Sequence, residues 1–209
     1  MTDWSAWHHD YADPLSALSQ RLQVVQQHIR SWLDVTAPAP VTVVSMCAGD
    51  GRDLLEALDG RPDGDRVTAT LVETDERNAE RARAHVTRLA LPGIQVRRSD
   101  AGNTDAYAGA VPADLVLACG IFGNIDDHDV RRTIAALPRL CAQEATVVWT
   151  RHREAPDLTP RVRTWFAEHD FKEIGFTAPS ATTWAVGAHR FCGQPAPLIA
   201  GQEMFTFIR

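Results

Sequence analysis

Hydrophobic residues in this chain follow two periods that alternate along most of its length. Short unbroken apolar runs, among them Val41–Met46, Val67–Val72 and Ala113–Ala118, lie between longer segments in which apolar residues recur every three or four positions. An unbroken run of this length is typical of a strand buried on both faces, whereas the longer period is that of an amphipathic helix. The alternation therefore predicts an α/β fold in which helices cover both faces of a mostly parallel sheet.

The same pattern places the other elements before residue 170. A first helix is expected to begin near Asp13-Pro14, because aspartate is a good N-cap and proline suits the first helical position. The segment TAPAP, residues 36–40, ends that helix. Residues 1–40 are thus predicted to form a helical extension or lid, and residues 41–209 a separate domain. Further helices are expected at Asp53–Leu58, Glu76–Leu89, Val130–Leu140 and from Thr159-Pro160, with strands at Ile94–Val96 and Ala145–Trp149.

The C-terminal part of the chain has a different pattern. Phe171–Phe176, Trp184–Ala188 and Met204–Ile208 all have the composition of strands, and no convincing helical segment separates them. This predicts a Rossmann-like, seven-stranded sheet that finishes with an antiparallel C-terminal strand. The pattern leaves open which of the last two segments is the final central strand. We favour Met204–Ile208, which makes residues 178–200 an insertion over the carboxyl edge of the sheet.

Composition and charge narrow the partners. The 209 residues carry a formal net charge of -6, so bulk charge does not favour nucleic-acid binding, and we expect no nucleic-acid partner. The four cysteines show no C-x-x-C spacing, which indicates a reducing compartment without zinc knuckle or disulfide framework. Neither a signal peptide nor a membrane-length apolar run is recognisable. We therefore expect a soluble cytoplasmic protein that is a monomer or homodimer.

The stretch VTVVSMCAGDGRD, residues 41–53, carries the first chemical signal. The strand is followed by Gly49 and Gly51, and two glycines in this loop allow a ligand to approach the backbone closely. Glu73, at the end of the second strand and 22 residues after Gly51, is placed to bind a ribose diol. Leu54 stands where a dinucleotide fingerprint has its third glycine, and the Asp50 carboxylate would repel a pyrophosphate. These features favour an adenosine that bears a cationic amino acid.

Five stretches, in this order, resemble the motifs of class I S-adenosylmethionine (SAM)-dependent methyltransferases. They are VVSMCAGDGRD, LVETDERNAERAR, VRRSDAGN, ADLVLACGIFGNI and ATVVWTRHR, and the resemblance covers roughly residues 41–209. The family usually has an acidic residue where Ser45 stands and glycine where Cys47 stands. The resemblance implies a methyltransferase with SAM as cofactor.

The resemblance also implies roles for individual residues. Ala48, Gly49 and Gly51 would meet the methionine moiety, Glu73 the ribose, and Asp100 with Ala101 the adenine. We also expect Cys47, Thr74, Cys119 and Gly120 beside the cofactor, and Tyr11 or Arg21 at its carboxylate.

The segment after the fourth strand bears on the acceptor. CGIFGNI, residues 119–125, lacks the Asn/Asp-Pro-Pro-aromatic stretch seen in relatives that modify amide or exocyclic amine nitrogens. Cys119-Gly120 supplies no carboxylate for a metal, and the later cluster Asp126, Asp127 and Asp129 is explained as a helix cap and first turn. We therefore expect no metal and no DNA or protein-glutamine acceptor.

Histidines are the candidate bases, because the imidazole titrates near neutrality. His152 follows a strand at the carboxyl edge and is the leading candidate; His128 and His9 are the other two. No H-x-H or H-x-x-x-H pair suggests a metal site. Candidate substrate contacts are Asn124, Arg151, Trp184 and His189.

The leading hypothesis is methyl transfer to a small-molecule acceptor. A SAM-using cyclase or lyase and a non-catalytic binding module of the same fold are the alternatives, and a nicotinamide oxidoreductase is disfavoured by Leu54. A small acceptor is favoured because no appended binding domain is recognisable.

Overall fold

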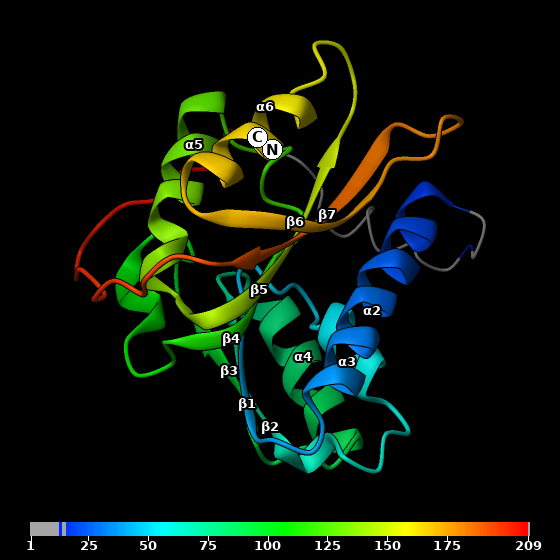
Figure 1. Ribbon diagram of the computed structural model, residues 1–209. Helices are drawn as coiled ribbons and strands as arrows, with labels where there is room; N and C mark the ends of the chain where they lie inside the picture. Colours follow the sequence, from blue (N-terminus) through cyan, green and yellow to red (C-terminus); the bar gives the residue numbers. More distant parts are fainter. Residues whose placement is uncertain (1–12, 14–15, 209) are drawn as a thin grey trace.

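A computed structural model describes Asp13 and residues 16–208 of the chain, which form a seven-stranded sheet between two layers of helices (Figure 1). The strand order is β3-β2-β1-β4-β5-β7-β6. The strands are β1 (Val41–Ser45), β2 (Val67–Glu73), β3 (Ile94–Arg98), β4 (Ala113–Ala118), β5 (Cys141–His152), β6 (Phe171–Thr177) and β7 (Trp184–Phe191). The first five are parallel, and β7 runs antiparallel to both of its neighbours.

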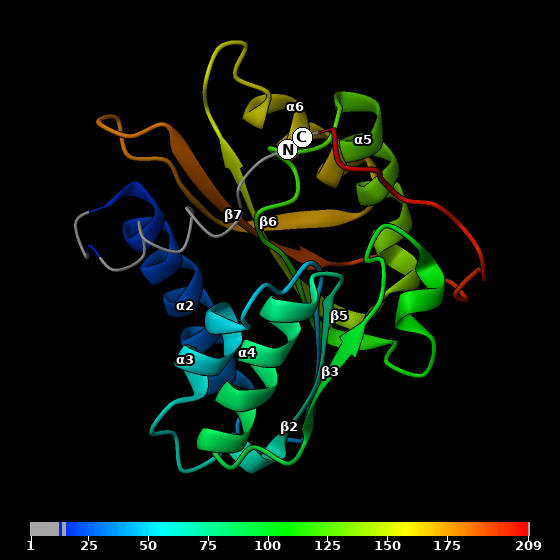
Figure 2. The same cartoon turned by 180° about the vertical axis from the view of Figure 1, so that it is seen from behind.

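Helices cover both faces of the sheet. They are α2 (Ala17–Thr36), α3 (Arg52–Leu58), α4 (Glu76–Arg88), α5 (Asp127–Ala136) and α6 (Thr159–Glu168). Figures 1 and 2 show α2, α3 and α4 on one face and α5 and α6 on the other. Within the described part of the chain, no helix is both long enough and apolar enough to cross a membrane.

Alternation along the strands sorts the apolar side chains into two cores. Val43 and Leu115 pack under α2 and α3, whereas their chain neighbours Val44 and Val116 face α5 and α6. This follows from the two-residue period of a strand, which sends successive side chains to opposite faces. Both faces are apolar, so the strands appear as unbroken hydrophobic runs in the sequence. The predicted α/β class with a mostly parallel sheet is confirmed.

The first helix begins later than Asp13-Pro14, so that predicted start is wrong. The N-cap is Ser16, whose hydroxyl accepts a hydrogen bond from the Ser19 amide at 3.0 Å. The Asp13 backbone carbonyl accepts from the Ser16 amide, and Pro14 lies outside the described residues. α2 packs against α3 and β7, which places it beside the sheet at the edge where the site is expected.

The last central strand is β7, not Met204–Ile208, and this corrects the C-terminal prediction. β7 lies between β5 and β6 and is hydrogen-bonded on both sides, and it continues to Phe191. Residues 178–183 are only the connection of an antiparallel hairpin. In the segment from Met204, the first two side chains are buried, but Thr206, Phe207 and Ile208 are exposed. A central strand requires a partner on each side, and this segment pairs with no strand of the described sheet.

Residues 201–208 instead form a strap, here called the C-terminal strap, across the carboxyl edge of the sheet. The Met204 amide donates to Gly102 O at 2.7 Å, and the Ile208 amide donates to Asn124 O at 3.0 Å. Between them the Thr206 amide donates to Asp129 Oδ2 at 2.9 Å. The strap thus connects the loop after β3 with the loop after β4, and Figure 2 shows it in red beside α5.

Asp129 is the side chain on which the strap depends. It is 8% exposed, and besides the Thr206 amide it pairs with Arg132 at 2.9 Å. We expect Asp129→Ala to lower the free energy of unfolding by about 1–3 kcal/mol, because the strap amide and Arg132 both lose the buried carboxylate to which they donate. Urea denaturation measures this. Asp127→Ala, in the same helical turn but exposed, should cost less than half as much; equal losses would contradict the anchoring role.

Candidate functional site

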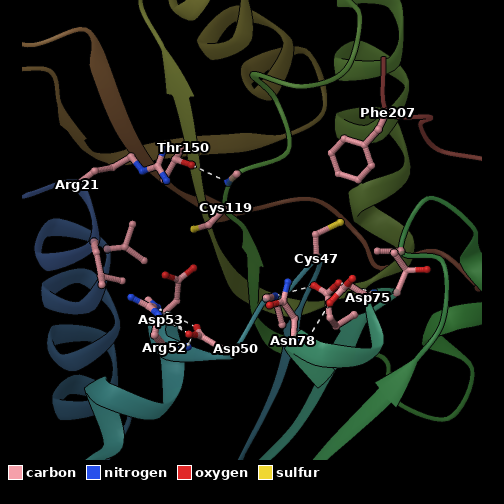
Figure 3. Close-up of a pocket in the computed structure, with 18 of the residues that line it drawn as sticks. Arg21, Cys47, Asp50, Arg52, Asp53, Asp75, Asn78, Cys119, Thr150 and Phe207 are labelled. Carbon is pink, nitrogen blue, oxygen red and sulfur yellow. Dashed lines mark hydrogen bonds and ion pairs between the residues drawn. The ribbon is translucent and has the colours of Figure 1, made fainter. Parts of the chain in front are cut away.

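A cavity of about 280 Å³ opens at the carboxyl ends of the parallel strands (Figure 3). α2, the loop after β1, the ends of β2, β3, β4 and β5, and the C-terminal strap all contribute to it. β1 and β4 are neighbours, but the helices that follow them, α3 and α5, lie on opposite faces. The chain therefore leaves a crevice between these strand ends, the usual ligand position in an open α/β sheet.

The loop after β1 forms one wall of the cavity through its backbone. Cys47, Gly49 and Gly51 have φ values of 52°, 58° and 79°, in the left-handed region that glycine tolerates best. The Ala48 amide donates to Val72 O at 2.8 Å, which fastens the loop to β2. Because the turn is tight, Cys47, Ala48 and Gly49 all reach the cavity.

Glu73, the last residue of β2, is the most constrained carboxylate of the site. It is 7% exposed, and its two oxygens accept hydrogen bonds of 2.7 Å from the backbone amides of Gly49 and Asp75. Burial raises the pKa of Glu73, and these two hydrogen bonds oppose the rise because they stabilise the carboxylate. Each oxygen keeps a second lone pair, so the group can accept from two adjacent hydroxyls.

The cavity wall is predominantly acidic. Two arginines, Arg21 and Arg52, line it together with five carboxylates: Asp50, Asp53, Glu73, Asp75 and Asp100. Arg52 is bound to Asp50, with its Nε 2.8 Å from Oδ1 and 3.1 Å from Oδ2. An excess of negative charge at low dielectric repels a pyrophosphate and attracts a cation. The donor and acceptor set therefore fits a phosphate-free nucleoside that carries positive charge.

Two cysteines line the same cavity without the properties of nucleophiles. Burial raises the pKa of the Cys47 and Cys119 thiols well above the ordinary value, and nearby carboxylates raise it further. Thiols in such surroundings stay protonated at neutral pH and react poorly. Both side chains therefore act as neutral, weakly polar parts of the wall.

Ten of the twelve predicted cofactor residues line this cavity. They are Arg21, Cys47, Ala48, Gly49, Glu73, Thr74, Asp100, Ala101, Cys119 and Gly120. Gly51 does not line it but forms the turn beneath, and Tyr11 lies outside the described residues.

Sequence reasoning did not assign the remaining lining residues. Leu22 and Val25 look like ordinary core positions of a helix, and Asp53 looks like a first-turn acid. Thr150 could have been predicted from β5, because successive side chains of a strand point to opposite faces. If Arg151 at the strand end does not reach the site, its neighbour Thr150 is the next candidate. Phe207 comes from the C-terminal strap and carries no sequence signal. Asp50, Arg52, Asp75 and Asn78 complete the lining.

His152, the leading candidate base, is the last residue of β5. It lies two positions after Thr150, so both side chains share a face of the sheet, but only Thr150 lines the cavity. The imidazole packs against the loop after β4: a β-carbon on Gly123 would lie 2.8 Å from His152 Cδ2. Its Nδ1 is buried without a hydrogen-bond partner among the described residues, 4.0 Å from Glu154 Oε2. The ring is thus beside the cavity rather than in its wall.

The other candidate bases are not brought to the cavity. The His128 side chain is 80% exposed in the first turn of α5, 3.4 Å from Asp129. With Asp126 and Asp129 it forms a surface group whose ligand atoms lie within 4.8 Å of one another. Asp126 caps α5 and Asp129 holds the strap, so both carboxylates already have structural roles. His9 lies outside the described residues.

Arg151 and Asn124 hold the loop after β4 instead of lining the cavity. The Arg151 guanidinium donates to Phe122 O and lies 3.8 Å from Asp127. Asn124 Nδ2 donates to Gly120 O at 2.8 Å, and the Asn124 carbonyl accepts from the strap. Both side chains therefore shape the edge of the site from outside it.

Trp184 and His189 belong to β7, which corrects their placement in an insertion. Trp184 is 5% exposed in the core under α2, and His189 is 1% exposed in the opposite core. Trp149 Nε1 donates to His189 Nδ1 at 3.1 Å, and the Phe166 ring stacks on the imidazole. Burial lowers the pKa of His189 to about 4, so the ring is neutral near pH 7. Neither residue lines the cavity.

The comparisons with known proteins agree with this geometry. The model of a family described as "Putative methyltransferase" matches residues 16–170, and the chain belongs to that family. It is therefore a methyltransferase, and the predicted class, a SAM-dependent enzyme of the class I fold, is confirmed. None of the curated proteins matches the chain in sequence.

Solved structures share the fold at low sequence identity. An O-methyltransferase family protein from Burkholderia thailandensis is 17% identical with a TM-score of 0.64; the match covers 83% of this chain but only 56% of that protein. Magnesium protoporphyrin IX methyltransferase from Synechocystis, solved with bound SAM, is 14% identical with a TM-score of 0.64 over 91% of each chain. A ribosomal protein L11 methylase from Lactobacillus delbrueckii is 12% identical with a TM-score of 0.58, over 82% of this chain and 79% of that one.

The two glycines of the loop should differ in their tolerance of alanine. A β-carbon on Gly51 would lie 2.8 Å from Leu55 Cδ1 and 2.9 Å from Leu71 Cδ1, whereas one on Gly49 would meet no atom within 4 Å. Both variants bear the strain of a left-handed residue, about 1–2 kcal/mol. Gly51→Ala should lose about 1–3 kcal/mol more from overpacking. Urea denaturation checks the difference. Equal losses of stability in the two variants would show that Leu55 and Leu71 move aside without cost.

Proposed function

We propose that this chain transfers the methyl group of SAM to a small-molecule acceptor and that the cavity at the β1–β4 crevice holds the cofactor. The observation that carries the proposal is Glu73. Its buried carboxylate is oriented by the amides of Gly49 and Asp75, at the strand end where a ribose diol is expected. The acidic wall around it suits a nucleoside that is cationic and lacks phosphate.

Different lining residues would bind different parts of the cofactor. Glu73 would accept from the ribose hydroxyls, Asp100 and Ala101 would meet the adenine, and the backbone around Gly49 would follow the methionine moiety. Arg21 would donate to the carboxylate. When bound, the sulfonium supplies an electrophilic methyl group.

The protein contributes positioning and exclusion of water. Holding a nucleophile in line with the methyl at contact distance, in a closed site, accounts for most of the acceleration that such a displacement needs. The C-terminal strap, through Phe207, and α2, through Leu22 and Val25, both bring apolar side chains to the cavity wall. These groups would give an acceptor apolar side chains to contact beside the cofactor.

A small acceptor is favoured by the chain's own charge and shape. The structurally similar proteins name very different acceptors, which include a porphyrin, a precorrin, a ribosomal protein and ribosomal RNA, so they do not decide among acceptor classes. A nucleic acid would bring phosphates to a wall lined by five carboxylates on a protein of net charge -6. An apolar or aromatic metabolite meets no such repulsion beside Phe207.

Removing the Glu73 carboxylate should weaken cofactor binding. We expect Glu73→Ala to reduce the affinity for S-adenosylhomocysteine by about 1–3 kcal/mol, the usual consequence of deleting a buried acceptor. Glu73→Gln keeps one acceptor oxygen and should lose less. Isothermal titration calorimetry measures both.

Glu76→Ala is the matched control, because Glu76 is exposed in the first turn of α4 and does not line the cavity. Unchanged affinity in Glu73→Ala would show that Glu73 does not bind the ribose hydroxyls.

His152 is proposed as the base for an acceptor that reacts only after losing a proton. His152→Ala should then slow turnover about 100-fold or more, the range of general base catalysis, while affinity for the cofactor stays the same. Single-turnover assays that follow S-adenosylhomocysteine formation test this. His169→Ala, at the C-terminal end of α6, should leave the rate unchanged.

An undiminished rate in His152→Ala would reduce the ring to a support for the loop at Gly123. Methylthioadenosine as the product would instead favour the lyase or cyclase alternative.

A further inference from the structure

The contacts proposed above leave an acidic residue of the cavity, Asp53, without a role. It stands in the first turn of α3, and α2, which packs against α3, brings Leu22 and Val25 to the same cavity. Figure 3 shows its carboxylate directed into the cavity, with the Cys119 thiol between it and Arg21. Glu73 ends β2 and Asp100 follows β3; these strands lie on the other side of β1 from β4 and Cys119, so the two carboxylates line the other end of the cavity.

The charges that face Asp53 come from three elements. Arg21 of α2 attracts its carboxylate, Asp50 and Arg52 lie beside it in the loop and α3, and the Cys119 thiol at the end of β4 forms a hydrogen bond with it. Arg52 is occupied by its ion pair with Asp50. Burial raises the pKa of Asp53 to about 6, with Arg21 the strongest opposing influence. The negative charge of Asp53 is thus only partly neutralised by its neighbours, and a cationic ligand would neutralise the rest.

We propose that Asp53 and Arg21 together form the receptor for the amino-acid end of the cofactor, with Asp53 accepting from the ammonium and Arg21 donating to the carboxylate. This inference rests on the proposed function. A zwitterion needs one anionic and one cationic partner, and these two side chains are such a pair. With the nucleoside at Glu73 and Asp100, the amino acid is left for the end of the cavity that this pair occupies.

The proposal links cofactor binding to protons. An ammonium stabilises ionised Asp53, so the pKa of Asp53 falls on binding, and protonated Asp53 must release its proton to bind. Affinity is therefore complete well above pH 6 and decreases as the pH falls through 6, because Asp53 becomes protonated in the empty cavity. From pH 7.5 to pH 5.0 the loss should be about tenfold, the change in the ionised fraction of a group of pKa about 6.

The first test uses two ligands that differ only in the amino acid. S-adenosylhomocysteine carries the zwitterion, and methylthioadenosine lacks it. By titration calorimetry at pH 7.5, Asp53→Asn should weaken S-adenosylhomocysteine at least tenfold and leave methylthioadenosine unchanged. The control Asp59→Asn, exposed at the end of α3, should leave both affinities as they are. Equal weakening of both ligands, or of neither, would overturn the proposal.

Decarboxylated S-adenosylmethionine separates the two partners. It keeps the ammonium and lacks the carboxylate, so Asp53→Asn should still weaken it, whereas Arg21→Gln should weaken S-adenosylhomocysteine only. If Asp53→Asn spares the decarboxylated ligand, Asp53 does not hold the ammonium.

Stability distinguishes recognition from a structural role. Ionised Asp53 is disfavoured by burial, so Asp53→Asn should melt at pH 7.5 no lower than the unmodified protein. A clear fall in melting temperature together with equal weakening of both ligands would show that Asp53 and Arg21 hold α2 against α3 and do not recognise the amino acid.

The unmodified protein gives a test that needs no variant. Its ratio of affinities for S-adenosylhomocysteine and methylthioadenosine should fall about tenfold between pH 7.5 and pH 5.0; a constant ratio would contradict the role of Asp53. If neither ligand binds the unmodified protein, the proposed function itself fails, which is a separate outcome from failure of this inference alone.

Discussion

The carboxylate of Glu73 joins the loop after β1 to the start of α4, and the shape of the cavity depends on that connection. Without it, the amides of Gly49 and Asp75 would lose this acceptor. Hydrogen bonds to an ionised group are stronger than neutral ones, and here two of them oppose the cost of burying the charge. A single side chain thus orients the glycine loop and fixes its own position towards a ligand. This is the preorganisation that a binding site needs.

Charge then determines what the cavity admits. Five carboxylates against two arginines create a negative field; Arg52 pairs with Asp50, and beside this pair Asp53 faces Arg21 across the Cys119 thiol. The same field that repels a dinucleotide is suited to a sulfonium and an ammonium. The C-terminal strap completes the wall with Phe207, and its attachment through Asp129 connects this wall to α5. The charged wall and the apolar wall of the cavity therefore come from different parts of the chain.

The sequence predicted the fold well where the pattern was strong and local. Buried strands such as Ala113–Ala118 are recognisable because both faces are apolar, and the glycine loop is recognisable because its turn needs left-handed residues. The C-terminal end could not be resolved this way, since Trp184–Ala188 and Met204–Ile208 have similar composition. The choice between them depends on long-range hydrogen bonds to β5 and β6, which leave no local signal.

Polar residues near strand ends were the other source of error. His189 and Arg151 looked available for a substrate, but Trp149 and Phe122 O occupy them. Asp53 shows the reverse case: a carboxylate in a first helical turn is common, and only the burial around it and the facing Arg21 reveal its place in the cavity. A sequence pattern identifies residue type and periodicity, whereas the partners of a polar group depend on tertiary packing.

A crystal structure of the chain with S-adenosylhomocysteine tests the central claim most directly. Our account predicts electron density for one nucleoside in the β1–β4 crevice, with its ribose hydroxyls on the Glu73 carboxylate. Density for a dinucleotide in that crevice, or for the nucleoside at a different place on the protein, would contradict it.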